Sequence, residues 1–360
     1  MTEDLGQPDA SATGGEPAGI RTAAVSEWLA EHVGTVGPLR FERLAGGHSN
    51  LTYRVDDAEG RRIVLRRPPE GELLPTAHDM GREHRLIEAL GPTDVPVPDA
   101  LATCTDPSVI GAPFYVMTHV DGVVLHTAAD AEAAFAEDER ARIGRDFIDV
   151  LGRLHAVDPD AVGLGDLSRK EDYIARQLKT WWRQYESSRT TEDPLLGQVH
   201  EWLQGNIPEQ GPARVVHGDF RLGNTITGPD ARIAAVLDWE IATLGDPLAD
   251  LGYVLATWPR PGDEHVATTS ATSMAAGFPE RAELLHAYAE ATGADLSGID
   301  YFVAWANWKT ACIVQGVYRR YVDGQLSTEG IDVPGFRRTV EAAAELAAEA
   351  IRRVDPGFGP

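Results

Sequence analysis

The residues best suited to chemistry lie in the stretch His217-Gly-Asp219-Phe-Arg-Leu-Gly-Asn224 and, further along, at Asp238. Phosphoryl transfer needs a carboxylate that orients the attacking hydroxyl and accepts its proton, and oxygen ligands that hold Mg²⁺ against a triphosphate. We therefore predict that Asp219 is the catalytic base and that Asn224 and Asp238 bind Mg²⁺. His217 is predicted to brace this catalytic loop by hydrogen bonds without transferring a proton. The alternative for Asp219 and Asn224 is an Asx-type turn.

A glycine-rich segment upstream has the composition of a phosphate-binding loop. It reads Ala45-Gly46-Gly47-His48-Ser49-Asn50 and stands between two predicted strands. Glycine lets backbone N–H groups approach phosphate oxygens, and a serine hydroxyl can donate one more hydrogen bond. We predict that Gly46, Gly47 and Ser49 contact ATP; a plain hairpin turn is the alternative.

A cation and an acid follow this segment. Strand alternation places Ile63 and Leu65 on one face of a predicted strand and Arg66 on the other. Glu83 stands on the next predicted helix. A cation that contacts the α- and β-phosphates and is oriented by an acid is the arrangement that kinases use. The alternative is a surface arginine and an unrelated helical glutamate.

The last predicted nucleotide contacts come from the backbone of Met117-Thr118-His119-Val120, which ends a short apolar strand. Backbone groups at such a junction between lobes can bind the edge of adenine. We predict these contacts at Met117, Thr118 and Val120.

Two lobes are predicted to position these residues. Residues 20–120 should form a small nucleotide-binding lobe, made of an antiparallel β-sheet and a helix. Residues 121–360 should form a larger, mostly helical lobe that carries the catalytic loop, the metal ligands and the acceptor site. The predicted class is therefore α+β with two lobes, a small β-rich lobe followed by a larger helical lobe. Strands are expected at 41–44, 51–55, 62–66 and 114–117, and helices at 81–90, 137–155, 173–188, 195–203, 281–292, 301–322 and 335–354. Residues 1–19, rich in Gly, Pro, Ala and acids, are predicted to be a disordered tail.

Size, charge and cysteine usage exclude other classes. A chain of 360 residues suits two lobes. A net charge of −24 argues against nucleic-acid binding, which needs basic stripes. No run of about 18 apolar residues suggests a membrane span, and the amino terminus lacks the pattern of a signal peptide. Cys104 and Cys312 stand far apart, so a reducing cytoplasm is the expected location.

Further polar residues are expected to have structural roles. Asp246 and Asp250, which follow the second motif, are expected to brace loops. His155 follows Leu151-x-x-Leu154 and is expected to be a hydrogen-bonded histidine at a helix end. None of them is predicted to bind metal or nucleotide.

The chain resembles the aminoglycoside phosphotransferase family, which shares the protein-kinase-like fold with choline kinases. The resemblance runs from about Leu39 to Tyr321, and its strongest marker is the catalytic loop followed by Leu237-Asp238-Trp-Glu240. It implies ATP and Mg²⁺ as cofactors and the roles given above. Arg66 departs from the more usual lysine; it cannot lose its charge, and it can clamp phosphate with two donors.

A narrower pattern resembles the kinase-like half fused to certain acyl-CoA dehydrogenases. It comprises 218–224, 238–253, 315–320 and the series Tyr173-x-x-x-Gln177-x-x-x-Trp181-x-x-x-Tyr185. The resemblance implies a hydroxylated acyl acceptor, such as a hydroxyacyl-CoA, and an acyl-CoA dehydrogenase in the same pathway. Predicted acceptor contacts are Tyr173, Gln177, Trp181, Gln315, Tyr318 and Arg319. For all of them, packing within the helical lobe is the alternative.

Two other functions stay open. The acidic composition mildly favours O-phosphorylation of cationic aminoglycosides, but such a site needs clustered carboxylates, and the predicted acceptor helix carries aromatic residues instead. A non-catalytic ATP-binding module is disfavoured because Asp219, Asn224 and Asp238 are all present.

Overall fold

The chain forms two compact units in the computed structural model, which describes residues 16–44, 50–70, 79–267, 271–326, 328 and 331–359. The first unit is Met1–Asp121 with Ala235–Glu240, and the second is Gly122–Ala234 with Ile241–Pro360. The segment 235–240, which the sequence division assigned to the larger lobe, therefore groups with the first unit.

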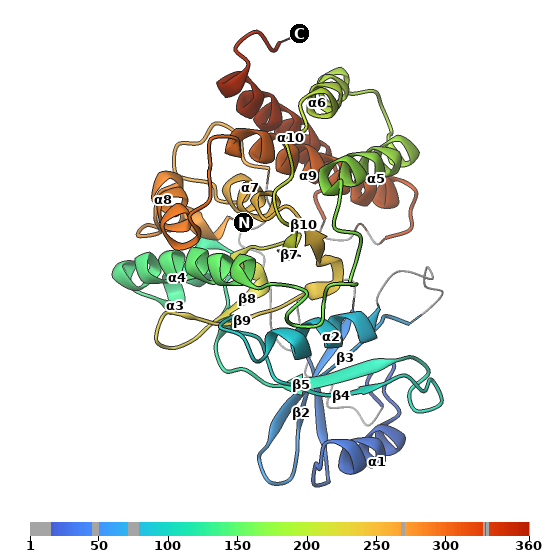
Figure 1. Cartoon of the computed structure of the whole chain (residues 1–360). Helices are drawn as coiled ribbons and strands as arrows, with labels where there is room; N and C mark the ends of the chain where they lie inside the picture. The colour runs from blue at the N-terminus through green and yellow to red at the C-terminus, as the bar shows by residue number, and fades with distance from the viewer. Residues whose placement is uncertain are drawn as a thin grey trace. The chain divides into compact units, whose positions relative to one another are not determined.

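A five-stranded antiparallel sheet organises the first unit, in the order β1-β2-β3-β5-β4 (Figure 1). The strands are β1 (Arg40–Arg43), β2 (Leu51–Asp56), β3 (Arg62–Arg67), β4 (Ala100–Cys104) and β5 (Phe114–Thr118). The predicted strands are confirmed, and β4 is the strand that was missed. Because β4 pairs with β5, it makes β5 a central strand.

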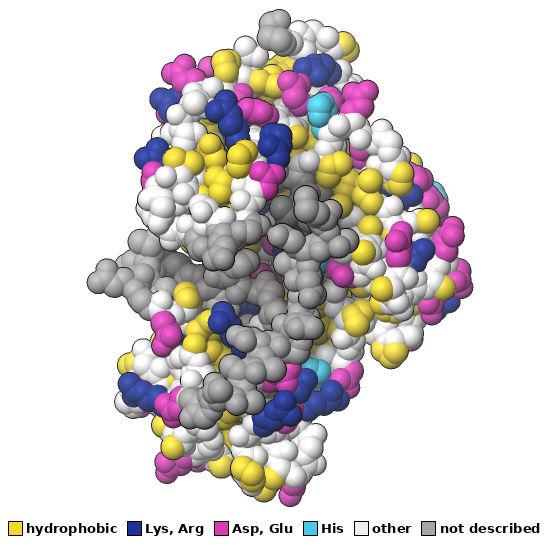
Figure 2. All heavy atoms as spheres, turned by 180° about the vertical axis from the view of Figure 1, so that it is seen from behind, with side chains coloured by type: hydrophobic (Ala, Val, Ile, Leu, Met, Phe, Trp, Pro, Cys, Tyr) yellow, Lys and Arg dark blue, Asp and Glu magenta, His cyan; other side chains and the backbone are white. Residues whose placement is uncertain are grey.

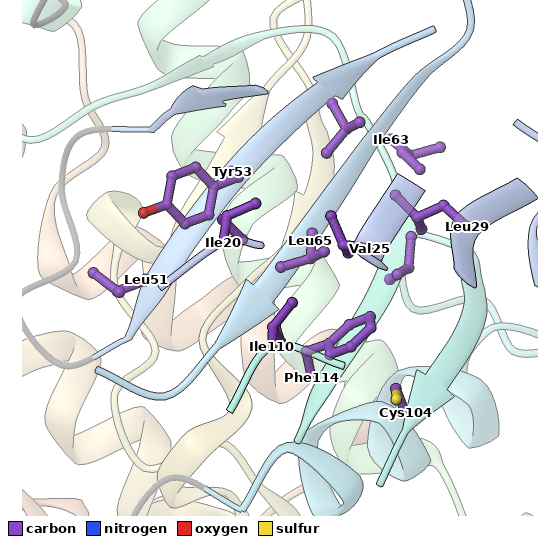
Figure 3. Packing of buried hydrophobic residues seen from close by; sticks show 12 residues of the cluster. Ile20, Val25, Leu29, Leu51, Tyr53, Ile63, Leu65, Cys104, Ile110 and Phe114 are labelled. Carbon is purple, nitrogen blue, oxygen red and sulfur yellow. The ribbon is translucent and has the colours of Figure 1, made fainter. Parts of the chain in front are cut away.

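The alternation predicted for β3 is confirmed. Ile63 and Leu65 belong to a buried cluster with Val25 and Leu29 of α1 (Thr22–His32), which covers this face of the sheet (Figure 3). Burying such an aliphatic side chain contributes about 1.5–3 kcal/mol. Arg66 points to the opposite face, where it meets α2 (Met80–Leu90), the helix predicted at 81–90.

The part of the chain that the structure describes begins at residue 16, before the boundary predicted at residue 20. The Tyr53 hydroxyl donates a hydrogen bond to the carbonyl oxygen of Ala18 at 2.5 Å, and the Arg67 guanidinium donates to that of Gly19. These contacts hold the part of the predicted tail that the structure describes, and residues 1–15 lie outside it.

The second unit is mostly helical. Each helix predicted between 137 and 354 is confirmed to within two residues at either end. They are α4 (Glu137–Ala156), α5 (Tyr173–Ser188), α6 (Pro194–Gly205), α8 (Arg281–Thr292), α9 (Ile299–Val322) and α10 (Val333–Val354); α3 (Ala128–Ala134) and α7 (Leu248–Ala256) were not predicted. α9 packs against α5, α6, α7 and α10. Among the described residues, no helix is long and apolar enough to cross a membrane.

Short strands frame the predicted catalytic loop. β7 (Arg214–Val216) precedes it and pairs with β10 (Thr243–Gly245), while β8 (Thr225–Thr227) follows it and pairs with β6 (Val123–Val124). β9 (Ile233–Val236) leads into the segment that carries Asp238. Acidic and basic side chains are interspersed over the face shown in Figure 2.

Candidate active site

Buried hydrogen bonds fix the start of the catalytic loop in the second unit. Gly218 has φ of +85°, a conformation that favours glycine. The Asp250 carboxylate accepts hydrogen bonds from the backbone N–H of His217 at 2.6 Å and of Gly218 at 2.8 Å. His155 Nε2 lies 3.3 Å from the same carboxylate, and its Nδ1 lies 2.7 Å from the Tyr288 hydroxyl. The structural roles predicted for Asp250 and His155 are confirmed.

Electrostatics agree with this bracing role. Burial alone would raise the pKa of Asp250, but the hydrogen bonds from His155 and from the loop amides lower it below its usual value. Asp250 therefore stays ionised inside the second unit and keeps both loop amides bound.

The Asp219 carboxylate is held by three donors. Asn224 Nδ2 donates to Oδ2 at 2.7 Å, and the Tyr253 hydroxyl donates to Oδ1 at 2.5 Å. Arg221 Nε lies 3.3 Å from Oδ1. Asn224 Nδ2 also donates to the Asp219 carbonyl oxygen at 2.9 Å, so its amide nitrogen is occupied within the loop and its oxygen is the atom suited to a cation.

His217 is fully buried. Its Nδ1 accepts a hydrogen bond from the backbone N–H of Asp219 at 3.2 Å, and its ring packs edge-on against Phe220. These contacts are those of a residue that braces the loop, as the sequence predicted.

Arg66, Glu83 and Asp238 form an ion-paired group in the first unit, called the phosphate-side cluster below. Arg66 Nε lies 3.0 Å from Glu83 Oε2, and its Nη2 pairs with Asp238 Oδ1. The Tyr115 hydroxyl donates to Glu83 at 3.1 Å, and Asn50 Nδ2 donates to it at 3.3 Å. The predicted pairing of Arg66 with Glu83 is therefore present, and a surface arginine is excluded.

The charges of this cluster perturb each other. Burial raises the pKa of Glu83 to about 7, with Arg66 opposing and Asp238 adding to the rise. Burial would lower the pKa of Arg66, but the carboxylates of Glu83 and Asp238 raise it above its ordinary value. Two carboxylates thus share one guanidinium.

Asp238 has an unusual backbone. Its φ is +65°, in the left-handed region that costs a non-glycine residue about 1–2 kcal/mol. The 3₁₀ turn Trp239–Ile241 follows directly, and the buried Trp239 indole donates to the carbonyl oxygen of Val236 at 3.2 Å. Such strain persists only where surrounding contacts hold it, and it is frequent at functional residues.

The structure describes only some of the other predicted nucleotide contacts. Gly46, Gly47 and Ser49 lie outside the described residues. Met117 faces Val64 of β3 and Ala100 of β4 in the sheet, so its backbone lies within a central strand. Thr118 donates its N–H to Asp99 and accepts a hydrogen bond from the N–H of Asp99 on its hydroxyl. Met117 and Thr118 thus belong to a central strand, and Val120 lies beyond its end. Nucleotide contacts at these three residues stay predictions.

Tyr173, Gln315 and Arg319 are packing or surface residues. Tyr173 is buried, with its ring so close over Gly245 that a Cβ there would lie 2.5 Å from it. Gln315 is buried and donates to the Ser188 carbonyl oxygen at 2.9 Å. Arg319 forms a surface ion pair with Asp323 at 2.8 Å. The burial of Tyr173 and Gln315 agrees with the packing alternative, and acceptor contacts at these three residues stay predictions.

Gln177, Trp181 and Tyr318 are half-buried. Trp181 Nε1 donates to Gln177 Oε1 at 2.7 Å, and its ring lies 5.7 Å from the Lys309 ammonium. These side chains keep exposed surface, so their acceptor roles stay predictions.

Sequence reasoning missed Arg221, Tyr253 and Lys309. Arg221 stands inside the quoted motif, so its position was available as a signal. Tyr253 reaches the loop from α7, and Lys309 from α9, with its Nζ 2.8 Å from the Gly218 carbonyl oxygen. Nothing in the local pattern around either residue indicates that contact.

Curated relatives match most of the chain through their kinase-like region. It is 35% identical over 332 residues to acyl-CoA dehydrogenase family member 10 of Mus musculus, covering 90% of this chain and 30% of that protein. It is 36% identical over 325 residues to family member 11 of Gallus gallus, covering 88% of this chain and 41% of that protein. The chain thus spans less than half the length of these relatives.

Solved structures support the fold. A candidate aminoglycoside phosphotransferase of Ralstonia eutropha is 33% identical with a TM-score of 0.77, covering 91% of this chain and 98% of that one. A mutant of aminoglycoside phosphotransferase APH(4)-Ia, solved with AMP-PNP and hygromycin B, has a TM-score of 0.60 at 18% identity, over 94% and 99% of the two chains. The latter likeness concerns the fold alone.

A family model brings these matches together. The model of the Phosphotransferase enzyme family matches residues 40–300, a range that contains Arg66, Glu83, the whole catalytic loop and Asp238. The sheet with α2, followed by a largely helical unit, is the kinase-like α+β architecture predicted from the sequence. This chain is a member of the Phosphotransferase enzyme family.

Proposed function

We propose that this chain transfers the γ-phosphoryl group of ATP to a hydroxyl group of a small molecule. The observation that carries the proposal is the Asp219 carboxylate, held on both oxygens by Asn224 at 2.7 Å and Tyr253 at 2.5 Å. Two fixed donors preorganise a carboxylate, which is what a group that orients an attacking hydroxyl requires. The phosphate-side cluster supplies the groups proposed to bind the nucleotide, namely one arginine and two acids.

Each residue has one task in the proposed reaction. The substrate hydroxyl, oriented by Asp219, attacks the γ-phosphorus; the bond from that phosphorus to the β-phosphate oxygen breaks, ADP leaves, and the hydroxyl proton passes to Asp219. Arg66 exchanges its contact with Asp238 for oxygens of the triphosphate and stays oriented by Glu83. The nucleotide contacts proposed from the sequence remain those at Gly46, Gly47, Ser49, Met117, Thr118 and Val120.

The donor set fits Mg²⁺. Asp238 offers a carboxylate and Asn224 an amide oxygen, and both are hard ligands. Mg²⁺ takes most of its ligands from water and phosphate, so two protein oxygen ligands suffice. When bound, Mg²⁺ neutralises negative charge on the triphosphate.

The proposed acceptor is a hydroxylated acyl compound such as a hydroxyacyl-CoA. Helix α5, which carries Gln177 and Trp181, contains three basic residues and one acidic residue, Glu186. This charge pattern does not suit a cationic aminoglycoside. The curated relatives are acyl-CoA dehydrogenase family members, which also favours an acyl-CoA dehydrogenase in the same pathway. Aminoglycoside phosphorylation is the second candidate, favoured by the likeness to the Ralstonia eutropha structure.

Nucleotide binding is the first test. ATP with Mg²⁺ should raise the melting temperature, and ATP in EDTA should raise it much less; ligand at a hundredfold excess over Kd stabilises by about 2.7 kcal/mol. Equal shifts in both conditions would contradict the metal assignment.

The acceptor is tested by phosphoryl transfer from labelled ATP. 3- and 4-hydroxyacyl-CoAs are compared with kanamycin, and the matching non-hydroxylated acyl-CoAs serve as controls. Transfer to the hydroxylated compounds alone is the expected result. Efficient labelling of kanamycin without labelling of hydroxyacyl-CoAs would establish the second candidate, and Mg·ATP binding without transfer to any acceptor would favour a non-catalytic module.

A further inference from the structure

Lys309 is an exception within this chain. Only three of the 32 basic residues are lysines, at 170, 179 and 309, and all others are arginines. Lys309 lies on α9 and is only 2% exposed. A fully buried lysine is rare unless its ammonium is paired, so the contacts of this side chain need a specific explanation.

An aromatic cage surrounds the Lys309 ammonium. The rings of Trp181 on α5, Tyr253 on α7 and Trp305 on α9 have centroids 5.7, 5.6 and 5.3 Å from Nζ. Among the described residues, this ammonium donates one hydrogen bond, to the Gly218 carbonyl oxygen at 2.8 Å. Cation–π attraction can offset part of the cost of desolvation and is strongest where water is excluded.

Gly218 is thereby held from two sides by buried charges of opposite sign. Its N–H donates to Asp250 Oδ1 at 2.8 Å, and its carbonyl oxygen accepts from Lys309 at the same distance. Asp250 and Lys309 are 1% and 2% exposed. Because glycine has the freest backbone of all residues, fixing both of its polar groups determines the direction in which the chain enters Asp219.

Packing alone does not account for a lysine here. Burial lowers the pKa of Lys309, with Asp219 and Asp250 opposing, so the buried charge carries a cost that an apolar side chain would avoid. The site is specific for a compact ammonium, since a planar guanidinium with five donors does not match a cage with one carbonyl acceptor.

We propose that Lys309 is a positioning residue for phosphoryl transfer, whose ammonium fixes the Gly218 carbonyl and thereby aims the Asp219 carboxylate. The inference rests on the proposed function, since the orientation of Asp219 matters only if Asp219 acts on a hydroxyl. It also gives Trp181 and Tyr253 a shared role as walls of the ammonium cage.

The first test separates turnover from nucleotide binding. Lys309→Met should lower kcat by about 10- to 100-fold, because a misplacement of about 1 Å costs up to that much, while Mg·ATP affinity stays within about twofold. Lys309→Arg keeps a positive charge beside Asp250 but replaces the compact ammonium by a planar guanidinium, so its kcat should also be lower than that of the wild type. Lys170→Met, at a lysine outside α5 that pairs with Asp160, is the matched control and should retain full turnover.

Chemical rescue distinguishes positioning from mere stability. Millimolar ethylammonium should raise the kcat of Lys309→Ala at least about tenfold, because the cage and the Gly218 carbonyl oxygen suit a small ammonium ion. Ethanol at the same concentration should not raise it. Equal effects of ethanol and ethylammonium, or full kcat in Lys309→Met, would overturn the proposal. If Lys309→Met and Lys309→Ala do not fold, Lys309→Arg carries the test, and wild-type kcat in that variant is the overturning result.

Hydrogen exchange gives a readout that needs no acceptor. Exchange of the His217 and Gly218 amides, followed in a peptide covering 214–224, should be at least about tenfold faster in Lys309→Met than in the wild type. Exchange in Lys170→Met should match the wild type. If the wild type transfers phosphate to no acceptor, the proposed function fails while this comparison still tests how Lys309 holds the loop. Unchanged exchange in Lys309→Met would refute the positioning role.

Discussion

The phosphate-side cluster of the first unit and the catalytic loop of the second are built on different physical principles. Arg66, Glu83 and Asp238 are charges paired with each other. Asp219 is a charge held by two neutral donors, Asn224 and Tyr253, with Arg221 beside it. An ion-paired cluster must exchange partners when an anionic ligand arrives, whereas neutral donors hold a carboxylate ready without rearrangement.

The difference concerns which step each group controls. The cluster should govern nucleotide affinity, because the Arg66–Asp238 pair has to open for the triphosphate. The loop should govern turnover, because the hydrogen bonds that orient Asp219 come from the loop itself and from α7. A loop variant that changes the affinity for Mg·ATP, or a cluster variant that leaves it unchanged, would contradict this division of roles.

The largest effect is expected for Asp219→Asn. Asparagine keeps the size of the side chain and much of its hydrogen bonding, but the group that accepts the proton is lost. General-base assistance is worth about 10²–10⁴-fold, so kcat should fall by that factor while calorimetric Mg·ATP affinity stays nearly unchanged. The matched variant Asp238→Asn removes a metal-binding charge and should weaken Mg·ATP binding as well as turnover. Near-normal turnover in Asp219→Asn, or equal loss of affinity in both variants, would show the roles to be misassigned.

A pH effect on stability is expected from the cluster. The pKa of Glu83 is raised by burial to about 7, so between its unfolded value near 4.5 and about 7 the folded state binds more protons than the unfolded state. The free energy of unfolding should therefore fall as pH rises through this window, by at most about 3 kcal/mol, with the Arg66 ion pair reducing the effect. Urea unfolding of wild type and Glu83→Gln from pH 4 to 8 checks this. The expected decline should be absent in the variant, and parallel curves would mean that Glu83 is ionised throughout.

Arg66→Ala should weaken Mg·ATP binding by roughly 10- to 100-fold, the range of charge-assisted hydrogen bonds, and Arg66→Lys should be milder. The control is Arg62→Ala, at an exposed arginine of the same strand that pairs with Asp121. Calorimetry on the three variants is the measurement. Unchanged affinity in Arg66→Ala would remove Arg66 from the nucleotide site.

The sequence predicted the parts of the site that lie in one short segment. Asp219 and Asn224 are five positions apart, so their contact follows from a single loop. Tyr253 and Lys309 reach that loop from 34 and 91 positions along the chain, measured to Asp219 and Gly218. Only the packing of α7 and α9 brings them there, and α7 itself was not predicted. It lies so close to α9 that a Cβ on Gly252 would lie 2.6 Å from the Phe302 backbone.

The surroundings of Met117 and Thr118 could not be predicted for the same reason. The sequence correctly indicated a strand at 114–117, but β4 was missed, and with it the second pairing partner of β5. β4 then pairs with β5 from Ala100 to Cys104, and Asp99 takes the polar groups of Thr118. Strand order is a long-range property, and the local pattern of apolar residues does not reveal whether a strand is central.

The smallest effect is expected for Tyr253→Phe, where two consequences oppose each other. Losing the 2.5 Å hydrogen bond frees a lone pair of Asp219 to accept the proton, which favours transfer, but it also releases one of the two neutral donors that aim the carboxylate. Burial and the nearby Asp219 charge raise the pKa of Tyr253 well above its ordinary value, so the phenol remains a donor at every working pH.

Orientation should prevail, because the loose transition state of phosphoryl transfer involves little proton transfer and depends mainly on positioning. We expect kcat to fall about three- to tenfold, as for the loss of one hydrogen bond, at unchanged Mg·ATP affinity. Tyr321→Phe, which keeps the ring stacked on Phe336, is the control and should match the wild type. A kcat above that of the wild type in Tyr253→Phe would mean that proton acceptance limits the reaction, and the loop would then have to be regarded as restraining its base as well as aiming it.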